Sequence, residues 1–261
     1  MSAARPTPRI DINCDIGEGF GAYTLGLDAD IMPRVSSANI ACGFHAGDPG
    51  SMRTTVALAE AHGVGIGAHP GFPDLRGFGR RAIEAAPSEI TDDLVYQIGA
   101  LTAFTRAKRL QHVKPHGALY NMAVARDDVA RAIGEAVLAV DRSLILVVLA
   151  GSPWERLARE MGLLVAREVF ADRAFDARGA LVPRSVPGAV IHDPGAVIER
   201  SLRLVLEHRV TALTGEDLDL HADTICLHGD TPGAVRLAAE LREAFARAGI
   251  AVVPMAQMVA P

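Results

Sequence analysis

The chain has 261 residues, of which 49% are hydrophobic and 22% are charged, and its formal net charge at pH 7 is -5. This composition is typical of a globular protein with a sizeable core and excludes the disordered and fibrous classes. The basic residues are scattered, and the sequence has neither a secretory signal nor an apolar run that could span a membrane, so we expect a cytoplasmic protein that binds neither nucleic acid nor membranes.

Short β-type runs alternate with helical patterns along nearly the whole chain. The expected strands are residues 9–14, 38–42, 64–69, 111–116, 144–149, 165–170, 223–228 and 250–254. Apolar residues at helical spacing predict helices over residues 49–63, 86–109, 127–140, 152–162, 193–208 and 231–249. This alternation is typical of parallel strands that are joined by helices.

No linker-like or low-complexity segment divides the chain, so we predict one domain over residues 1–261. Seven or eight strand–helix units in a chain of about 250 residues match an α/β fold of the closed β/α barrel type. An open, doubly wound sheet is the alternative. Residues 170–193 form a polar insertion rich in Pro and Gly, and a loop of this length is typical of a lid, a binding loop or a disordered segment.

Polar residues follow the ends of most predicted strands, in segments such as "NCDIGEG", "ACGFHAGD", "KPHGALYN" and "CLHGD". In parallel α/β folds the carboxyl ends of the strands open on one face, where the functional site is built. We therefore expect a cluster of strand-end residues on this face: Asp15, His45, His69, Lys114, His116 and His228.

Alternation along two of these strands indicates which side chains point inward, since residues two apart share a face. One inward set is Asp11, Asn13 and Asp15, and the other is His112, Lys114 and His116. Asp11 lies deeper in its strand than Asp15, and a buried carboxylate requires a partner. Lys114 and Arg173 are the candidates for that partner.

Metal binding is an alternative role for the strand-end cluster. Asp15 with His45 and His69 would offer donors for a divalent ion that activates water. The segment "GEGFGA" matches a dinucleotide-binding fingerprint, but Glu18 would lie in the loop that should hold a pyrophosphate, which argues against nucleotide binding there. The three cysteines are far apart and odd in number, so we expect free thiols.

Two loops after predicted strands combine arginines with glycines or prolines. The arginines are Arg76, Arg80 and Arg81 in the first loop, and Arg178 and Arg184 in the 170–193 insertion. Guanidinium groups and free backbone N–H groups suit phosphate or carboxylate ligands. Solvated surface arginines are the alternative interpretation.

Six motifs together resemble the LamB/YcsF lactam-utilisation family over residues 9–253. They are "IDINCDIGEGFG", "SSANIACGFHAGDP", "IGAHPGFPDLRGFGRR", "QHVKPHGALYN", "EVFADRAFDARGALVPRSVPGAVI" and "TICLHGD". One departure is Phe175, where the family often has a tyrosine, so no hydroxyl role is expected at that position.

The resemblance implies a β/α barrel related to the glycoside hydrolase and deacetylase superfamily. It also implies a 5-oxoprolinase complex that uses ATP to open the lactam 5-oxo-L-proline to L-glutamate, in which the chain acts with two further subunits, B and C. The ATP would be accompanied by Mg²⁺, for which Asp15 and Glu18 are suitable ligands.

In this reaction Lys114 and the first arginine loop would hold anions, while Asp15 with His45 or His69 would act as a base or an ion anchor, and His116 or His228 would transfer a proton. The full set expected to bind substrate or phosphate is Asn13, Glu18, Arg76, Arg80, Arg81, Arg173 and Arg184. Two alternatives stay open: a metal-dependent amidase or deacetylase that needs no nucleotide, and a non-catalytic subunit that binds the substrate.

Overall fold

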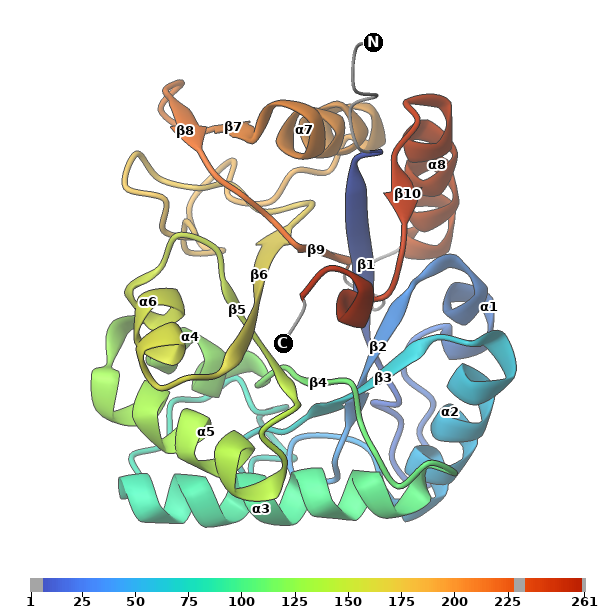
Figure 1. Cartoon of the computed structure of the whole chain (residues 1–261), viewed down its shortest axis with the longest axis vertical. Coiled ribbons are helices and arrows are strands. Elements are labelled where there is room, and N and C mark those ends of the chain that lie inside the picture. The colour runs from blue at the N-terminus through green and yellow to red at the C-terminus, as the bar shows by residue number, and fades with distance from the viewer. Residues whose placement is uncertain (1–6, 228–232, 260–261) are drawn as a thin grey trace, which may run out of the picture.

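Seven parallel strands form a closed barrel in the computed structural model, which describes residues 7–227 and 233–259 (Figure 1). In order around the barrel they are β1 (Arg9–Ile16), β2 (Ser37–Ala41), β3 (Gly65–His69), β4 (His112–Val113), β5 (Ile145–Leu149), β6 (Leu164–Phe170) and β9 (Thr224–Leu227). Pairing of β1 with both β2 and β9 closes the barrel. The predicted β/α barrel is confirmed, and the open sheet is excluded.

Helices surround the strands, as Figure 1 shows. The predicted helices are α2 (Pro49–His62), α3 (Pro87–Phe104), α5 (Asp127–Val140), α6 (Pro153–Glu160), α7 (Pro194–Glu207) and α8 (Ala234–Arg247). Three of them, α2, α6 and α7, begin with a proline directly after the N-cap residue. The N-cap residues are Asp48, Ser152 and Asp193, and each side chain accepts a hydrogen bond from a backbone N–H of the first turn. Helix α3 ends at Phe104, earlier than predicted.

Several elements were not predicted. Helix α4 (Gly117–Ala125) follows β4 and packs against α5 and α6. Because it is covered on several sides, its sequence is mostly apolar and lacks the alternation of polar and apolar faces by which the other helices were predicted. Strands β7 (Arg209–Thr211) and β8 (Asp217–Asp219) form an antiparallel hairpin. A short helix, α1 (Asp28–Ile31), and a 3₁₀ turn, η1 (Met32–Arg34), lie between β1 and β2.

The expected eighth strand is short and does not enter the barrel wall. It is β10 (Ala251–Val252), which pairs only with the start of β1. The chain then forms the 3₁₀ helix η2 (Met255–Gln257), which lies across the amino end of the barrel (Figure 1), where Met255 packs on Ile145, Val147 and Ala166. The 3₁₀ helix η2 thus covers the interior of the barrel at this end, and the carboxyl ends of the strands lie at the opposite end.

The two faces of β1 differ in chemistry. Ile10, Ile12 and Cys14 of β1 belong to the apolar core, whereas Asp11 and Asn13 are buried polar residues. This confirms the alternation predicted for β1. Cys14, Cys42 and Cys226 are all buried free thiols, as expected.

The 170–193 insertion continues from the end of β6 as irregular turns with two isolated bridges, Arg173 with Val190 and Phe175 with Leu181. Phe175 is fully buried, with the guanidinium of Arg200 5.3 Å from the centre of its ring. A hydrophobic side chain therefore suits this position. None of the described helices is both long and apolar enough to cross a membrane.

Candidate active site

A cavity of about 190 Å³ opens at the carboxyl ends of the barrel strands. Its polar lining includes Asp15 of β1, His69 of β3, Lys114 and His116 after β4, Arg80, and Arg173 and Arg184 of the insertion. Phe170, Tyr120 and Leu181 supply apolar surface. Residues from distant parts of the chain thus meet at the end of the barrel where the strand-end motifs predicted a site.

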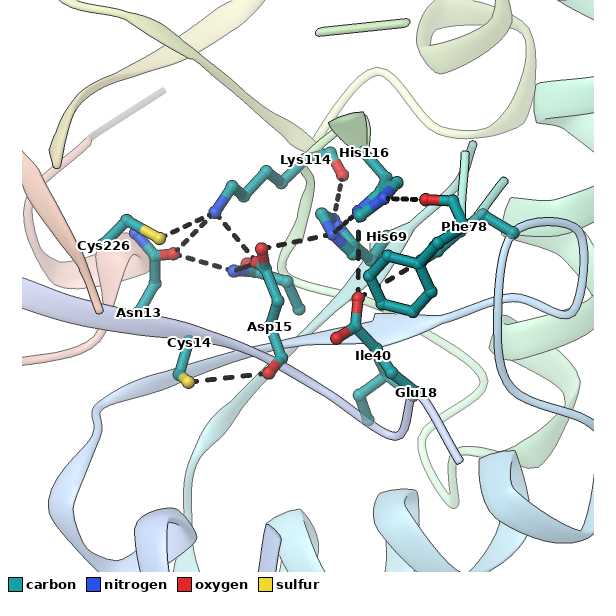
Figure 2. Close-up of polar contacts among 12 residues, drawn as sticks. Asn13, Cys14, Asp15, Glu18, Ile40, His69, Phe78, Lys114, His116 and Cys226 are labelled. Atoms are coloured by element: carbon teal, nitrogen blue, oxygen red, sulfur yellow. Dashed lines mark hydrogen bonds and ion pairs between the residues drawn. The ribbon is translucent and has the colours of Figure 1, made fainter. Parts of the chain in front are cut away.

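Lys114 is the centre of a buried polar network, which Figure 2 shows. Its Nζ lies 2.9 Å from Asp15 Oδ1, 3.0 Å from Glu168 Oε1 and 3.0 Å from Cys226 Sγ. Only 2% of the lysine side chain is exposed. The network therefore holds a lysine ammonium and two carboxylates with little water around them.

These charges stabilise one another. Burial by itself would raise the pKa of the Asp15 carboxyl, but the adjoining His69 and Lys114 outweigh burial and hold that pKa well below its usual range. Burial by itself would lower the pKa of Lys114, but Asp15, Cys226 and Glu168 hold it well above its usual value. Asp15 and Lys114 are therefore both ionised at neutral pH.

Asn13 and Asn39 form the layer below this network. Asn13 Oδ1 accepts a hydrogen bond of 2.7 Å from Asn39 Nδ2, while Asn13 Nδ2 donates to Glu168 Oε1 at 3.1 Å. The Nδ2 of Asn39 also donates to Asp15 Oδ1 at 2.8 Å. Asn13 was predicted to bind substrate, but it is fully buried and does not line the cavity. It orients the side chains that surround Lys114 above it.

Asp11 lies deepest of the β1 acids, and the partners expected for it were wrong. Neither Lys114 nor Arg173 reaches it; instead the hydroxyls of Ser36 and Ser37 each donate to Asp11 Oδ1 at 2.7 Å, and Thr224 donates to Oδ2. Burial raises the pKa of Asp11 to about 6, although these hydroxyls oppose the shift. Hydroxyl donors satisfy the carboxylate without supplying a positive charge.

The stability of the protein should depend on the titration of Asp11. Folding raises its pKa from 3.8 to about 6, so between these values the folded chain keeps a proton that the unfolded chain loses, and stability falls as the pH rises. The shift corresponds to roughly 3 kcal/mol at about 1.4 kcal/mol per pH unit. Urea denaturation gives the free energy of unfolding of the wild type and of Asp11→Asn. The difference between the two, wild type minus variant, should fall by up to about 3 kcal/mol from pH 4 to pH 7. A constant difference would contradict the prediction.

Three histidines and Glu18 gather beside Asp15. His116 Nδ1 lies 2.9 Å from His69 Nε2, and Glu18 Oε1 lies 3.5 Å from His45 Nε2 and 3.8 Å from His116 Nδ1. One donor atom from each of the four side chains lies within 4.8 Å of the others. Burial, reinforced by the neighbouring histidines, lowers the pKa of His116 to about 3 and that of His45 well below its usual value, so both rings are neutral at pH 7.

Gly79 packs against the His45 and His116 side chains, and its lack of a side chain leaves room for them. Its φ is +62°, and a Cβ there would lie 2.7 Å from both His45 Cβ and His116 Cδ2. Only glycine fits this position without displacing the rings.

The predicted arginines divide into two groups. Arg80, Arg173 and Arg184 line the cavity. Arg173 Nη2 donates to the carbonyl of Val182 at 2.8 Å, and its buried Nε makes no hydrogen bond within the described part of the chain. Arg76 and Arg81 do not line the cavity: Arg76 is exposed, and Arg81 forms an ion pair with the buried Asp74.

The remaining site predictions have different outcomes. His228, expected at the end of β9, lies outside the described residues. Glu168 and Asn39 were not singled out from the sequence. Asn39 alternates with Ser37 in β2, which is a local signal for a polar face, whereas Glu168 follows Arg167 in β6 and gives no such signal.

A family model for the LamB/YcsF family matches residues 10–260. The A subunit of 5-oxoprolinase from Syntrophobacter fumaroxidans is 55% identical over 249 residues, which cover 95% of this chain and 98% of that protein. The A subunit of 5-oxoprolinase from Pyrococcus horikoshii is 51% identical over 253 residues, which cover 96% of this chain and 99% of that protein.

Solved structures agree with these similarities. A lactam utilization protein from Thermus thermophilus superposes with a TM-score of 0.90 at 51% identity, over 94% of this chain and 99% of that one. A putative cellobiose-phosphate cleavage protein from Enterococcus faecalis superposes with a TM-score of 0.59 at 12% identity, over 98% and 100% of the two chains. The second likeness concerns the fold alone.

Proposed function

The chain belongs to the LamB/YcsF family, and from this premise we propose that it is the A subunit of a 5-oxoprolinase, which opens the lactam 5-oxo-L-proline to L-glutamate in the cavity at the carboxyl end of the barrel. The near-complete coverage of relatives that are named as the A subunit of 5-oxoprolinase supports this assignment.

The division of charge in the cavity is the observation that carries the proposal. Arg80, Arg173, Arg184 and Lys114 bring positive charge to one small space, and Asp15, His69 and His116 bring proton-accepting groups to the same space. Its volume of about 190 Å³ is below the roughly 300–1,000 Å³ of pockets for drug-sized ligands. The cavity suits a small anionic metabolite such as 5-oxoproline, whose carboxylate matches the arginines.

The chemistry explains a need for ATP. An unstrained five-membered lactam is a poor electrophile, and phosphorylation of its oxygen activates the ring carbon. Water adds to that carbon, and the ring C–N bond breaks with protonation of the nitrogen, which leaves an acyl phosphate of glutamate. A second water cleaves the acyl phosphate to L-glutamate and inorganic phosphate. ATP with Mg²⁺ is the phosphoryl donor in this proposal. A cavity of this size has no room for a nucleotide beside the lactam, so ATP would bind elsewhere in the complex or at an interface with another polypeptide.

Each half of the cavity has a role in ring opening. The arginines bind the substrate carboxylate and the charge of the added phosphate. Lys114 places its ammonium at the cavity wall, where negative charge develops on the lactam oxygen. Asp15 lines the same cavity, where its carboxylate holds the attacking water and takes up its proton.

The relatives are named as one subunit of an enzyme, which implies a complex with other subunits, and we assign the partners of this chain to subunits B and C of 5-oxoprolinase. The three free thiols and the use of ATP favour the cytoplasm as the location of this complex.

A coupled glutamate-release assay tests the proposal. We expect glutamate from 5-oxo-L-proline only when this chain, both partner subunits and ATP are present together. Release by this chain alone without nucleotide would contradict the proposal and favour a nucleotide-independent amidase. Full turnover by a complex that contains Asp15→Asn would instead favour a non-catalytic binding subunit.

A further inference from the structure

We propose that Glu18, His45, His69 and His116 bind one divalent transition-metal ion of the zinc class at the carboxyl end of the barrel. Binding of the ion does not depend on the proposed function.

Hydrogen bonds to the backbone fix which nitrogen of two rings is available. His69 Nδ1 lies 2.7 Å from the carbonyl oxygen of Lys114, and His116 Nε2 lies 2.8 Å from that of Phe78 (Figure 2). A carbonyl oxygen only accepts, so each of these nitrogens carries the hydrogen. A neutral ring with its hydrogen on that nitrogen presents a bare lone pair on the other one, which is Nε2 in His69 and Nδ1 in His116.

These two lone pairs face each other across 2.9 Å. Two acceptors at this distance repel unless a positive charge lies between or beside them, either a proton or a metal ion. A hydrogen bond from the second nitrogen of each ring to a backbone carbonyl is also the arrangement that orients metal-binding histidines in proteins.

His45 supplies the observation that favours a metal ion over a proton. Its side chain is fully buried, and neither ring nitrogen makes a hydrogen bond within residues 7–227 and 233–259. An unsatisfied buried polar group is costly, and metal coordination would satisfy it. A proton shared by His69 and His116 would leave His45 as it is.

The spacing of the donors fits a metal ion after a small adjustment. Around a tetrahedral ion with bonds of about 2.1 Å, neighbouring donors lie roughly 3.4 Å apart. The distances from Glu18 Oε1 to the two nearest ring nitrogens are 3.5 and 3.8 Å. The His45 and His116 rings stack with centroids 3.8 Å apart, and because a metal lies in the plane of an imidazole ligand, binding would tilt these rings out of parallel.

The donor set identifies the class of ion. Three imidazole nitrogens and one carboxylate oxygen suit Zn²⁺ and its transition-metal neighbours, whereas Mg²⁺ prefers oxygen ligands. The set differs from the one predicted from the sequence, because Asp15 is already held by Lys114 and Asn39 through its Oδ1. Asp15 Oδ2 lies 3.4 Å from His69 Nε2, next to the proposed ion.

The test measures metal directly. The full chain is stripped with a chelator, dialysed against ZnCl₂ or CoCl₂ alone and analysed for bound metal by mass spectrometry and titration calorimetry. We expect one equivalent per chain and, with Co²⁺, the strong visible absorption of a tetrahedral complex. Loss of a residue that only hydrogen-bonds to a metal ligand already lowers metal affinity by about 10–100-fold. Glu18→Gln and His116→Gln each remove a ligand itself, so each should weaken binding by at least about 100-fold.

Two controls isolate the site. Asp15→Asn should bind the metal as the wild type does, because Asp15 is not one of the four proposed ligands. Loss of binding in this variant would instead indicate a site that includes Asp15. His208 and His221 form an exposed pair with ring centroids 4.1 Å apart, and replacing both by alanine removes the most obvious surface site. Circular dichroism confirms that each variant folds.

The contrary outcomes are specific. No stoichiometric binding by the stripped wild type would overturn the proposal and leave a shared proton between His69 and His116. Binding that survives Glu18→Gln and His116→Gln, or that disappears only with the surface pair, would also overturn it. Because glutamate release plays no part in these measurements, a failure of the proposed function would leave their result unchanged.

Discussion

Lys114→Met is expected to lower the free energy of unfolding by about 3–5 kcal/mol, the usual cost of removing one partner from a buried ion pair. The substitution keeps the length of the side chain but leaves Asp15 and Glu168 buried without the ammonium that lies 2.9 and 3.0 Å from them. It also removes positive charge from the cavity wall, so the complex should show no measurable glutamate release. Urea denaturation and the coupled assay measure the two effects.

Two further variants show whether the effect comes from the uncompensated carboxylates. Adding Glu168→Gln to Lys114→Met removes one of them and should restore part of the lost stability without restoring activity. Lys108 is the only other lysine in the chain; it is exposed after α3, and its Nζ donates to the carbonyl of Ala103. Lys108→Met should therefore leave glutamate release unchanged and lower the free energy of unfolding far less than Lys114→Met does. The explanation fails if the double variant is less stable than the single one.

Alternation within strands predicted the interior of the barrel well, because it depends only on local geometry. Asp11, Asn13 and Asp15 point inward from β1, and Lys114 meets Asp15 and Asn13 from the other side of the barrel. The strand-end motifs placed His69 and His116 at the carboxyl end of the barrel, where they line the cavity. A polar residue at every second position of an apolar strand is a signal that needs no knowledge of the fold.

Pairing across the barrel is not local, and this explains what the sequence did not reveal. Glu168 meets Asn13, which lies 155 residues away, and Cys226 meets Lys114, which lies 112 residues away. The residues near Glu168 in the sequence do not show whether its carboxylate points into the barrel, where it has partners, or lies at the edge of a strand. For the same reason the partner of Asp11 was misjudged, since a lysine and three hydroxyls are equally plausible until the neighbouring strands are in register.

The two arginine loops illustrate the same limit. Arg80 and Arg81 are adjacent in sequence, yet Arg80 lines the cavity while Arg81 turns to Asp74. Composition indicated that the loop holds anions, but only the path of the backbone decides which guanidinium faces the ligand. Arg173 and Arg184 reach the cavity because the 170–193 insertion continues directly from β6, whose end forms part of the cavity wall.

Asp15→Asn should reduce kcat/KM of the assembled complex by about 10²–10⁴-fold, the range typical of a lost acid–base group. The amide has nearly the same shape as the carboxylate, and its oxygen can still accept from Lys114 and Asn39, which now donate to Asp15 Oδ1 at 2.9 and 2.8 Å. Its NH₂ group, however, would replace Oδ2 beside His69 Nε2 and could not take up a proton. The fold should therefore persist while the chemistry fails.

The pH dependence of this loss distinguishes a charge effect from a titrating base. Burial opposes the shift, but His69 and Lys114 hold the pKa of Asp15 well below its usual range, so the carboxylate is ionised throughout the pH range of the assay. Its contribution to stability is lost only when the pH falls through that lowered pKa. The ratio of wild-type to Asp15→Asn kcat/KM should then be constant from pH 5 to pH 8. Asp92→Asn, which changes an exposed carboxylate on α3, is the matched control and should keep wild-type activity. A ratio that rises steeply with pH in this interval would mean that Asp15 titrates there, and would contradict the ion-pair description of the site.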